Sequence, residues 1–156
     1  MKEGQSLPRI EIDCKENCSG CSSCMQACPQ GCISMQADEE GFIYPEVDDS
    51  QCIGCGLCLK SCPFNIRKPN DKQPLAYGGW NNDPKIKGNS SSGGIFSAIA
   101  QMVIANHGVV FGAAFDQALH LKHQMVAECD DLIMLRGSKY LQSDIGDSYR
   151  EVQEKV

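Results

Sequence analysis

The sequence has no long apolar run, no secretory signal and no surplus of positive charge. None of its 156 residues belongs to a stretch of the roughly 18 apolar residues that a membrane-spanning helix needs. Met1 to Ile10 lack the apolar core of a signal peptide. Asp and Glu outnumber Lys and Arg by 20 to 14, which gives a net charge of −6. These absences predict a protein with no membrane span and no nucleic-acid partner.

Cysteine, by contrast, is abundant: the chain contains 11, and most of them fall in two runs. Each run has the spacing C-x2-C-x2-C-x3-C and is followed directly by proline. A shift of 34 positions carries every cysteine of the first run onto a cysteine of the second, and Gly20 onto Gly54. The first run comprises Cys18, Cys21, Cys24 and Cys28, and the second comprises Cys52, Cys55, Cys58 and Cys62. The sequence therefore contains an internal duplication of one ligand unit.

This spacing predicts two 4Fe–4S clusters. Thiolates are soft ligands that suit iron–sulfur clusters, and three closely spaced cysteines can converge on one cubane. The three residues before the fourth cysteine allow a short helical turn, which the following proline ends. In this bacterial type of run the fourth cysteine serves the other cluster. We therefore expect one cluster to be bound by Cys18, Cys21, Cys24 and Cys62, and the other by Cys52, Cys55, Cys58 and Cys28.

Zinc and disulfides are the alternative interpretations of paired C-x2-C units. A zinc site takes four ligands and gives no role to a third evenly spaced cysteine or to the closing Cys-Pro. Of the remaining cysteines, we expect Cys14 not to be a ligand, Cys32 to pack as a small hydrophobic residue near a cluster, and Cys129 not to be a nucleophile. Free thiols beside clusters favour a reducing compartment, so the predicted location is the cytoplasm of an anaerobe.

The predicted fold class is α+β, with a ferredoxin-like two-cluster iron–sulfur module followed by an incomplete α/β domain. The module covers residues 1–68. A linker rich in Pro, Asn, Gly, Lys and Ser covers residues 69–89. The second domain covers residues 90–156, and we interpret it as the N-terminal part of a larger domain.

Hydrophobic patterns predict the elements of both parts. Apolar residues alternate on either side of Asp38–Gly41, which predicts a hairpin that shields the clusters from water. The apolar run Ile95–Ala105 predicts a helix buried on nearly every face. We further expect strands at Ile10–Ile12, 75–80, 109–115, 120–127 and 139–142. Two more helices are predicted: a short one through Leu135, capped by Asp130 or Asp131, and a final one capped by Asp144.

Two loops of the second domain carry polar residues with two interpretations each. Ser90–Gly94 lies directly before the predicted helix, where a serine can cap the helix or free N–H groups can hold a phosphate. From these residues alone, capping is the favoured interpretation. Arg136–Tyr140 joins two cations, a glycine and hydroxyls, and a solvated turn is the simpler interpretation. His120 and His123 are expected to point to opposite faces of a strand and not to share a metal.

Residues 18–63 look like a bacterial-type two-cluster ferredoxin. Behind them, three segments resemble the coenzyme F420 hydrogenase/dehydrogenase beta-subunit family, in its N-terminal part: Ser90–Ala100, Gly108–Asp116 and Arg136–Ser143. In that family, iron–sulfur clusters exchange electrons with a bound flavin, usually FAD, which exchanges hydride with the deazaflavin F420 or another acceptor. By this resemblance, the flavin or substrate site receives contributions from Ser91, Ser92, Gly93, Gly94, Ser138 and Lys139.

The leading functional hypothesis is electron transfer through two 4Fe–4S clusters to or from a flavin, within an oxidoreductase of that family. A flavin joins the one-electron chemistry of clusters to the two-electron chemistry of hydride carriers. Its partners would be a redox protein or further oxidoreductase subunits, with F420 or another hydride acceptor as substrate. This chain alone is not expected to be catalytic, and no catalytic residue is assigned. The alternative is a stand-alone ferredoxin-type electron carrier with a non-catalytic C-terminal fragment.

Overall fold

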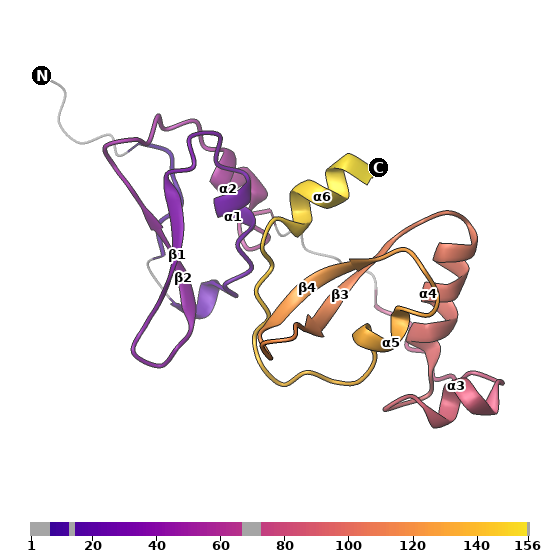
Figure 1. The fold of residues 1–156 in the computed structure, drawn as a ribbon. Helices are drawn as coiled ribbons and strands as arrows, with labels where there is room; N and C mark the ends of the chain where they lie inside the picture. The colour runs from indigo at the N-terminus through magenta and orange to yellow at the C-terminus, as the bar shows by residue number, and fades with distance from the viewer. Residues whose placement is uncertain (1–6, 13–14, 67–72, 156) are drawn as a thin grey trace, which may run out of the picture. The chain divides into compact units, whose positions relative to one another are not determined.

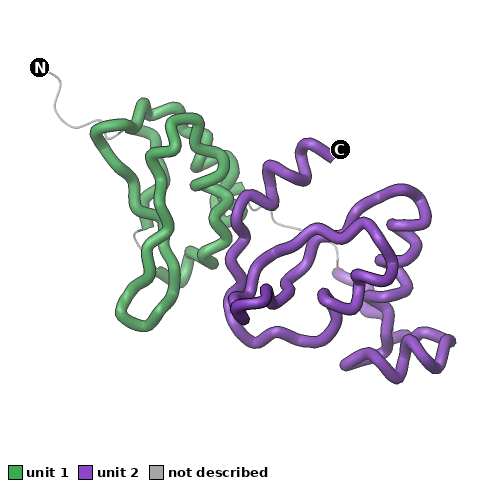
Figure 2. Tube along the Cα trace, viewed as in Figure 1, with its two compact units in different colours: residues 1–72 green, residues 73–156 purple. Residues whose placement is uncertain are grey.

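The computed structural model describes residues 7–12, 15–66 and 73–155, drawn in colour in Figure 1. The chain divides into two compact units, residues 1–72 and 73–156 (Figure 2). Each unit contains one small antiparallel sheet of two strands together with short helices. The fold is therefore mixed α and β. Among the helices of the described residues, none has the length and apolar character needed to cross a membrane.

Unit 1 contains a hairpin and three short helical segments. These are η1 (Lys15–Asn17), α1 (Ser23–Gln26), β1 (Ile33–Ala37), β2 (Ile43–Val47) and α2 (Leu57–Ser61). The strands pair from Ile33 opposite Val47 to Ala37 opposite Ile43, which confirms the predicted hairpin. At its acidic tip, the Asp38 carboxylate accepts the N–H groups of Glu40 and Phe42. Lys15 forms an ion pair with the same carboxylate at 2.5 Å.

The internal duplication is visible in the backbone of the two cysteine loops. Gly20 and its counterpart Gly54 have φ angles of 63° and 64°. Ser22 and its counterpart Gly56 have φ angles of 61° and 69°, and each directly precedes a helix. Left-handed backbone of this kind favours glycine because a Cβ atom crowds the following carbonyl. Both loops therefore turn in the same way before α1 and α2 begin.

The core of unit 1 is rich in sulfur. Its buried residues are Ile10, Cys24, Cys32, Ile33 and Cys58. Such a small core supplies little hydrophobic stabilisation, so cluster ligation would contribute folding free energy directly. Ile10 and Ile12 do not form the predicted edge strand. Residues 10–12 belong to no strand, and the N–H of Ile10 donates to the sulfur of Cys58.

Unit 2 is built around a second hairpin. Its elements are α3 (Pro84–Gly88), α4 (Ile95–Ala105), β3 (Val110–Phe115), β4 (Leu121–Val126), α5 (Leu132–Leu135) and α6 (Ser148–Lys155). The strands pair from Val110 opposite Val126 to Phe115 opposite Leu121. Helices α4 and α5 both contact β3, whereas α6 contacts β4. The core between them consists of Ala100, Ala114, Val126, Leu132 and Leu135.

The bounds predicted for the long helix are confirmed, but its predicted burial is wrong. In the part of the chain that the structure describes, α4 buries only Ser97 and Ala100. Its apolar side chains Ile95, Phe96, Ile99 and Met102 are 42% to 61% exposed. Strand β3 contacts α4, and among the described residues these four side chains of α4 remain exposed.

Several shorter predicted elements are also wrong. Residues 75–80 and 139–142 form no strand. Asp144 does not cap the final helix: it forms an isolated parallel bridge with Lys122, its carboxylate accepts the N–H of Gly146, and α6 begins only at Ser148. Asp131 does occupy the cap position of α5, but its side chain makes no capping hydrogen bond.

The predicted linker contains a helix. Within residues 69–89, Asp83 caps α3 by accepting the N–H groups of Lys85 and Ile86, and Pro84 stands at the first helical position. Both features are standard signals for the start of a helix. Residues 69–72 of the predicted linker lie outside the described residues.

Candidate functional site

The first cavity of unit 1 gathers four of the predicted cluster ligands. It is lined by Cys18, Cys21 and Cys24 from the first run and by Cys62 from the end of the second. Its wall also contains the apolar residues Ile10, Ile12, Met35, Pro45, Pro63 and Phe64. The hairpin β1–β2 contributes Met35 and Pro45, so it does cover this group of cysteines.

The second cavity gathers the other four. It is lined by Cys52, Cys55 and Cys58 from the second run and by Cys28 from the end of the first. Its wall also contains Arg9, Cys32, Ile33 and Val47. The structure therefore places the fourth cysteine of each run beside the triplet of the other run. The short helices α1 and α2, which contain the third cysteine of each run, carry the chain from one cavity to the other.

These two groups fit cubane clusters by their donor sets, since each supplies four thiols in a largely apolar wall. Among the described residues, no three His, Cys, Asp or Glu side chains are grouped to hold one metal ion.

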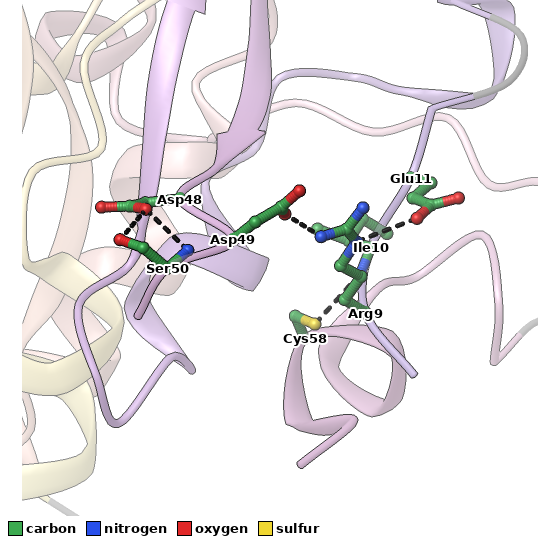
Figure 3. A network of polar contacts seen from close by, with 7 residues as sticks. All are labelled: Arg9, Ile10, Glu11, Asp48, Asp49, Ser50 and Cys58. Carbon is green, nitrogen blue, oxygen red and sulfur yellow. Dashed lines mark hydrogen bonds and ion pairs between the residues drawn. The ribbon is translucent and has the colours of Figure 1, made fainter. Parts of the chain in front are cut away.

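Hydrogen bonds reach two of the predicted ligand sulfurs in the second cavity. The N–H of Ile10 donates to Sγ of Cys58 at 3.2 Å in a buried setting (Figure 3). Sγ of Cys28 and Sγ of Cys32 are 3.4 Å apart. Cys32 is buried with 6% exposure, which confirms the prediction that it packs as a small residue within this core.

The protein environment affects the thiols of the two cavities differently. Burial raises the pKa of Cys24, in the first cavity, to about 11. Burial also opposes ionisation of Cys28, but hydrogen bonds from the backbone and side chain of Cys32 and from the backbone of Gln30 and Gly31 lower its pKa below the usual value. The same contact with Cys28, together with burial, raises the pKa of Cys32 to about 11. These opposite shifts favour Cys32 as the donor and Cys28 as the acceptor in this pair.

Neither Cys129 nor a histidine is part of the walls of these two cavities. Cys14 lies outside the described residues. Cys129 is exposed, as is His120, which lies 3.5 Å from the carboxylate of Asp116. Nδ1 of His123 lies 2.9 Å from Oγ of Ser143. The two histidines thus have different partners.

A third cavity, of about 340 Å³, lies within unit 2. It brings together the two polar loops of the sequence, because its wall contains the whole of Ser90–Gly94, the start of α4, and Arg136, Gly137 and Ser138. Its volume is in the range of small-molecule sites. Of the residues predicted for a flavin or substrate site, Ser91, Ser92, Gly93, Gly94 and Ser138 line this cavity.

Lys139 and Arg136 have roles that the sequence did not reveal. Lys139 is absent from the cavity wall, and its ammonium donates to the carbonyl oxygens of Met134 at 3.1 Å and Arg136 at 2.7 Å. Burial lowers the pKa of Lys139. Arg136 does line the cavity, and its Nε donates to Oγ of Ser97 at 3.1 Å. Arg136 is therefore the cation in the cavity wall. Lys139 instead stabilises the loop through the hydrogen bonds of its ammonium to backbone carbonyls.

Serine does not cap α4, so the favoured interpretation of Ser90–Gly94 is wrong. The cap position is occupied by Gly94 in a left-handed conformation with φ of 76°, without a side-chain hydrogen bond. Oγ of Ser90, which follows α3, donates instead to the carbonyl oxygen of Ile86 within that helix, at 2.6 Å. The N-terminus of α4 therefore borders the cavity with no side chain capping it, and such a terminus favours negative charge.

Two cavities of four cysteines each, with the fourth cysteine exchanged between runs, are the arrangement expected of a two-cluster iron–sulfur domain. Comparison with protein families agrees: residues 17–66 match the 4Fe-4S dicluster domain. The match indicates iron–sulfur electron transfer for unit 1. It ends at residue 66, so the resemblance of residues 90–143 to the F420 hydrogenase/dehydrogenase beta subunit stays a prediction. No curated protein matches the chain.

Proposed function

We propose that unit 1 binds two 4Fe–4S clusters and that the chain transfers single electrons through them. The ligands of the first would be Cys18, Cys21, Cys24 and Cys62, and those of the second Cys28, Cys52, Cys55 and Cys58. The exchange of the fourth cysteine between the two cavities carries this proposal. When bound, the clusters supply one-electron redox chemistry.

The rest of unit 1 positions the thiols and excludes water. Met35 and Pro45 cover the first group of cysteines, whereas Ile33 and Val47 cover the second. A single hairpin thereby shields both sites with alternate residues of its two strands. Limited access of water is one of the factors that set the reduction potential of a cluster.

Anaerobic purification of the chain tests this proposal. We expect brown protein with about eight iron atoms per chain, an EPR signal on reduction and no stoichiometric zinc. Colourless protein that binds zinc in place of iron under anaerobic reconstitution would contradict the proposal. Iron, sulfide and zinc analysis on the same sample distinguishes the two results.

For unit 2, we propose a flavin site, with FAD as the ligand, in the cavity between Ser90–Gly94 and Arg136–Ser138. The uncapped start of α4 and the guanidinium of Arg136 suit the phosphate groups of FAD. Electrons would pass between the clusters and this flavin, and then to F420 or another hydride acceptor. Fluorescence titration of the deflavinated chain with FAD tests the site, and no binding at micromolar FAD would count against it.

A second candidate is a stand-alone ferredoxin-type carrier, which the restriction of the family match to residues 17–66 favours. In that case the chain would shuttle electrons to an external acceptor without binding flavin. Its acidic net charge of −6 suits docking to a basic patch on a cytoplasmic redox partner. Reduction of a basic acceptor such as cytochrome c by the flavin-free chain, at a rate that falls with added salt, would support this candidate.

A further inference from the structure

The two cysteine cavities are products of one duplication, but their surroundings differ. A shift of 34 carries Cys32 onto Ile66 and Arg9 onto Ile43. Cys32 and Arg9 line the second cavity. Ile66 and Ile43 are apolar and are not part of the wall of the first. Among the described residues, the wall of the second cavity therefore contains a thiol besides its four expected ligands and a cation, and the wall of the first contains neither.

The thiol of Cys32 is placed to donate to a ligand. Its Sγ lies 3.4 Å from Sγ of Cys28, and both atoms lie in the sulfur-rich core. A cysteine that binds iron does so as a thiolate and can only accept a hydrogen bond. In the assembled site the donor must therefore be Cys32.

The amide of Ile10 supplies the second donor. It reaches Sγ of Cys58 at 3.2 Å, while the Ile10 side chain lines the first cavity. The residue that the duplication places opposite Ile10 is Tyr44. Tyr44 belongs to β2 and is paired there with Gln36, so the equivalent segment is part of the sheet.

Arg9 fixes the segment that carries this amide. Its guanidinium forms ion pairs with Glu11, at 2.9 Å, and with Asp49 in the turn after β2 (Figure 3). The pair with Asp49 ties the N-terminal segment to the hairpin, 40 residues away in the sequence. Arg9 thus positions Ile10 and also brings a guanidinium, paired with two carboxylates, to the wall of the second cavity.

Hydrogen bonds to cluster sulfurs and nearby positive charge stabilise the more negative, reduced form of a cluster. We propose that the cluster held by Cys28, Cys52, Cys55 and Cys58 has the higher reduction potential of the two, and that Cys32, the Ile10 amide and Arg9 set this order. This inference rests on the proposed function. A single added electron would then reside mainly at the second site, where Cys55 is exposed to solvent.

The test is an EPR-monitored redox titration of the anaerobically prepared full chain. Cys55→Ser identifies the second site, because a changed ligand alters the midpoint and the signal of its own cluster. We expect Cys55→Ser to move the wave of higher potential. Cys32→Ala, which removes the donor, should shift that same wave to more negative potential. Cys32→Ser keeps a donor of similar size and should restore most of the shift.

Arg9→Gln provides a second variant that leaves the thiols intact, and it should lower the same midpoint. The controls are Ile66→Ala, at the position equivalent to Cys32, and Lys60→Gln, which removes an exposed charge from α2. Both should leave the two midpoints in place. A Cys55→Ser variant that moves the lower wave, or Cys32→Ala and Arg9→Gln variants without a shift, would overturn this inference alone. A chain that binds no iron would instead overturn the proposed function.

Discussion

Nε of Arg136 lies 3.1 Å from Oγ of Ser97, and this hydrogen bond joins the loop after α5 to the first turn of α4. Ser97 is 1% exposed, so the bond anchors the guanidinium at the inner wall of the unit 2 cavity. The contact spans 39 residues of sequence and brings together the two polar loops that had no evident connection in the primary structure.

Removing this guanidinium should weaken the binding of an anionic ligand. We expect Arg136→Met to lower the affinity for FAD roughly 10-fold or more, because a hydrogen bond to a charged group contributes about 1.5–3 kcal/mol. Lys85→Met removes an exposed cation from α3, outside the cavity wall, and serves as the control. Isothermal titration with FAD measures both variants. Equal affinities for the two would show that the cavity does not use Arg136 for binding.

The cysteine spacing predicted the arrangement of unit 1 because its geometry is local. Two residues between cysteines fix a tight loop, and the following helix and Cys-Pro set where the fourth cysteine emerges. The roles of Ile10 and Arg9 were not predictable in this way. Both depend on contacts with Cys58 and Asp49 that lie 40 or more residues away.

Unit 2 was less predictable because its details depend on tertiary packing. The apolar run Ile95–Ala105 does form a helix, but its exposure depends on how much of the unit covers it. Ser90 had the right position and chemistry for a cap near α4, yet α3 offers its hydroxyl a carbonyl acceptor at 2.6 Å. Lys139 was similarly predicted as a site residue because of its charge, whereas in the structure its ammonium donates to backbone carbonyl oxygens.

Exchange of the fourth cysteine gives a prediction about pairs of variants. With Cys18, Cys21 and Cys24 all changed to Ser, only the second cluster should assemble, giving about four irons per chain. Adding Cys28→Ser to this variant should abolish or strongly reduce iron binding, whereas adding Cys62→Ser should have little effect. Iron analysis and EPR measure the outcome. The reverse dependence would mean that each run binds its own cluster with all four of its cysteines.

The turn before β4 should be sensitive to acid through Asp116. N–H donation from His120 and the Lys122 ammonium lower the pKa of Asp116 to about 2. Because this pKa is depressed, the charged carboxylate stabilises the turn above the unfolded value of about 3.9, and the stabilisation is lost as pH falls towards 2. Asp116→Ala should therefore increase hydrogen exchange of the Ala118 and His120 amides at pH 6. The difference from the unaltered chain should shrink below pH 4, and a pH-independent difference would contradict this account.

Gly54 and Gly31 have nearly the same left-handed backbone, with φ of 64° and 62°, but different surroundings. A Cβ atom at Gly54 would lie 2.8 Å from Cδ2 and 3.2 Å from Cβ of Leu7, whereas one at Gly31 would meet nothing within 4 Å. Gly31→Ala should therefore lower the free energy of unfolding only by the backbone strain, about 1–2 kcal/mol. Gly54→Ala should lower the free energy of unfolding further, because the side chain of Leu7 would have to move away from the loop that carries Cys52 and Cys55. Denaturant unfolding of the anaerobic protein, followed by the loss of visible absorption, compares the two variants. Equal shifts of the midpoint would show that Leu7 does not restrain this loop.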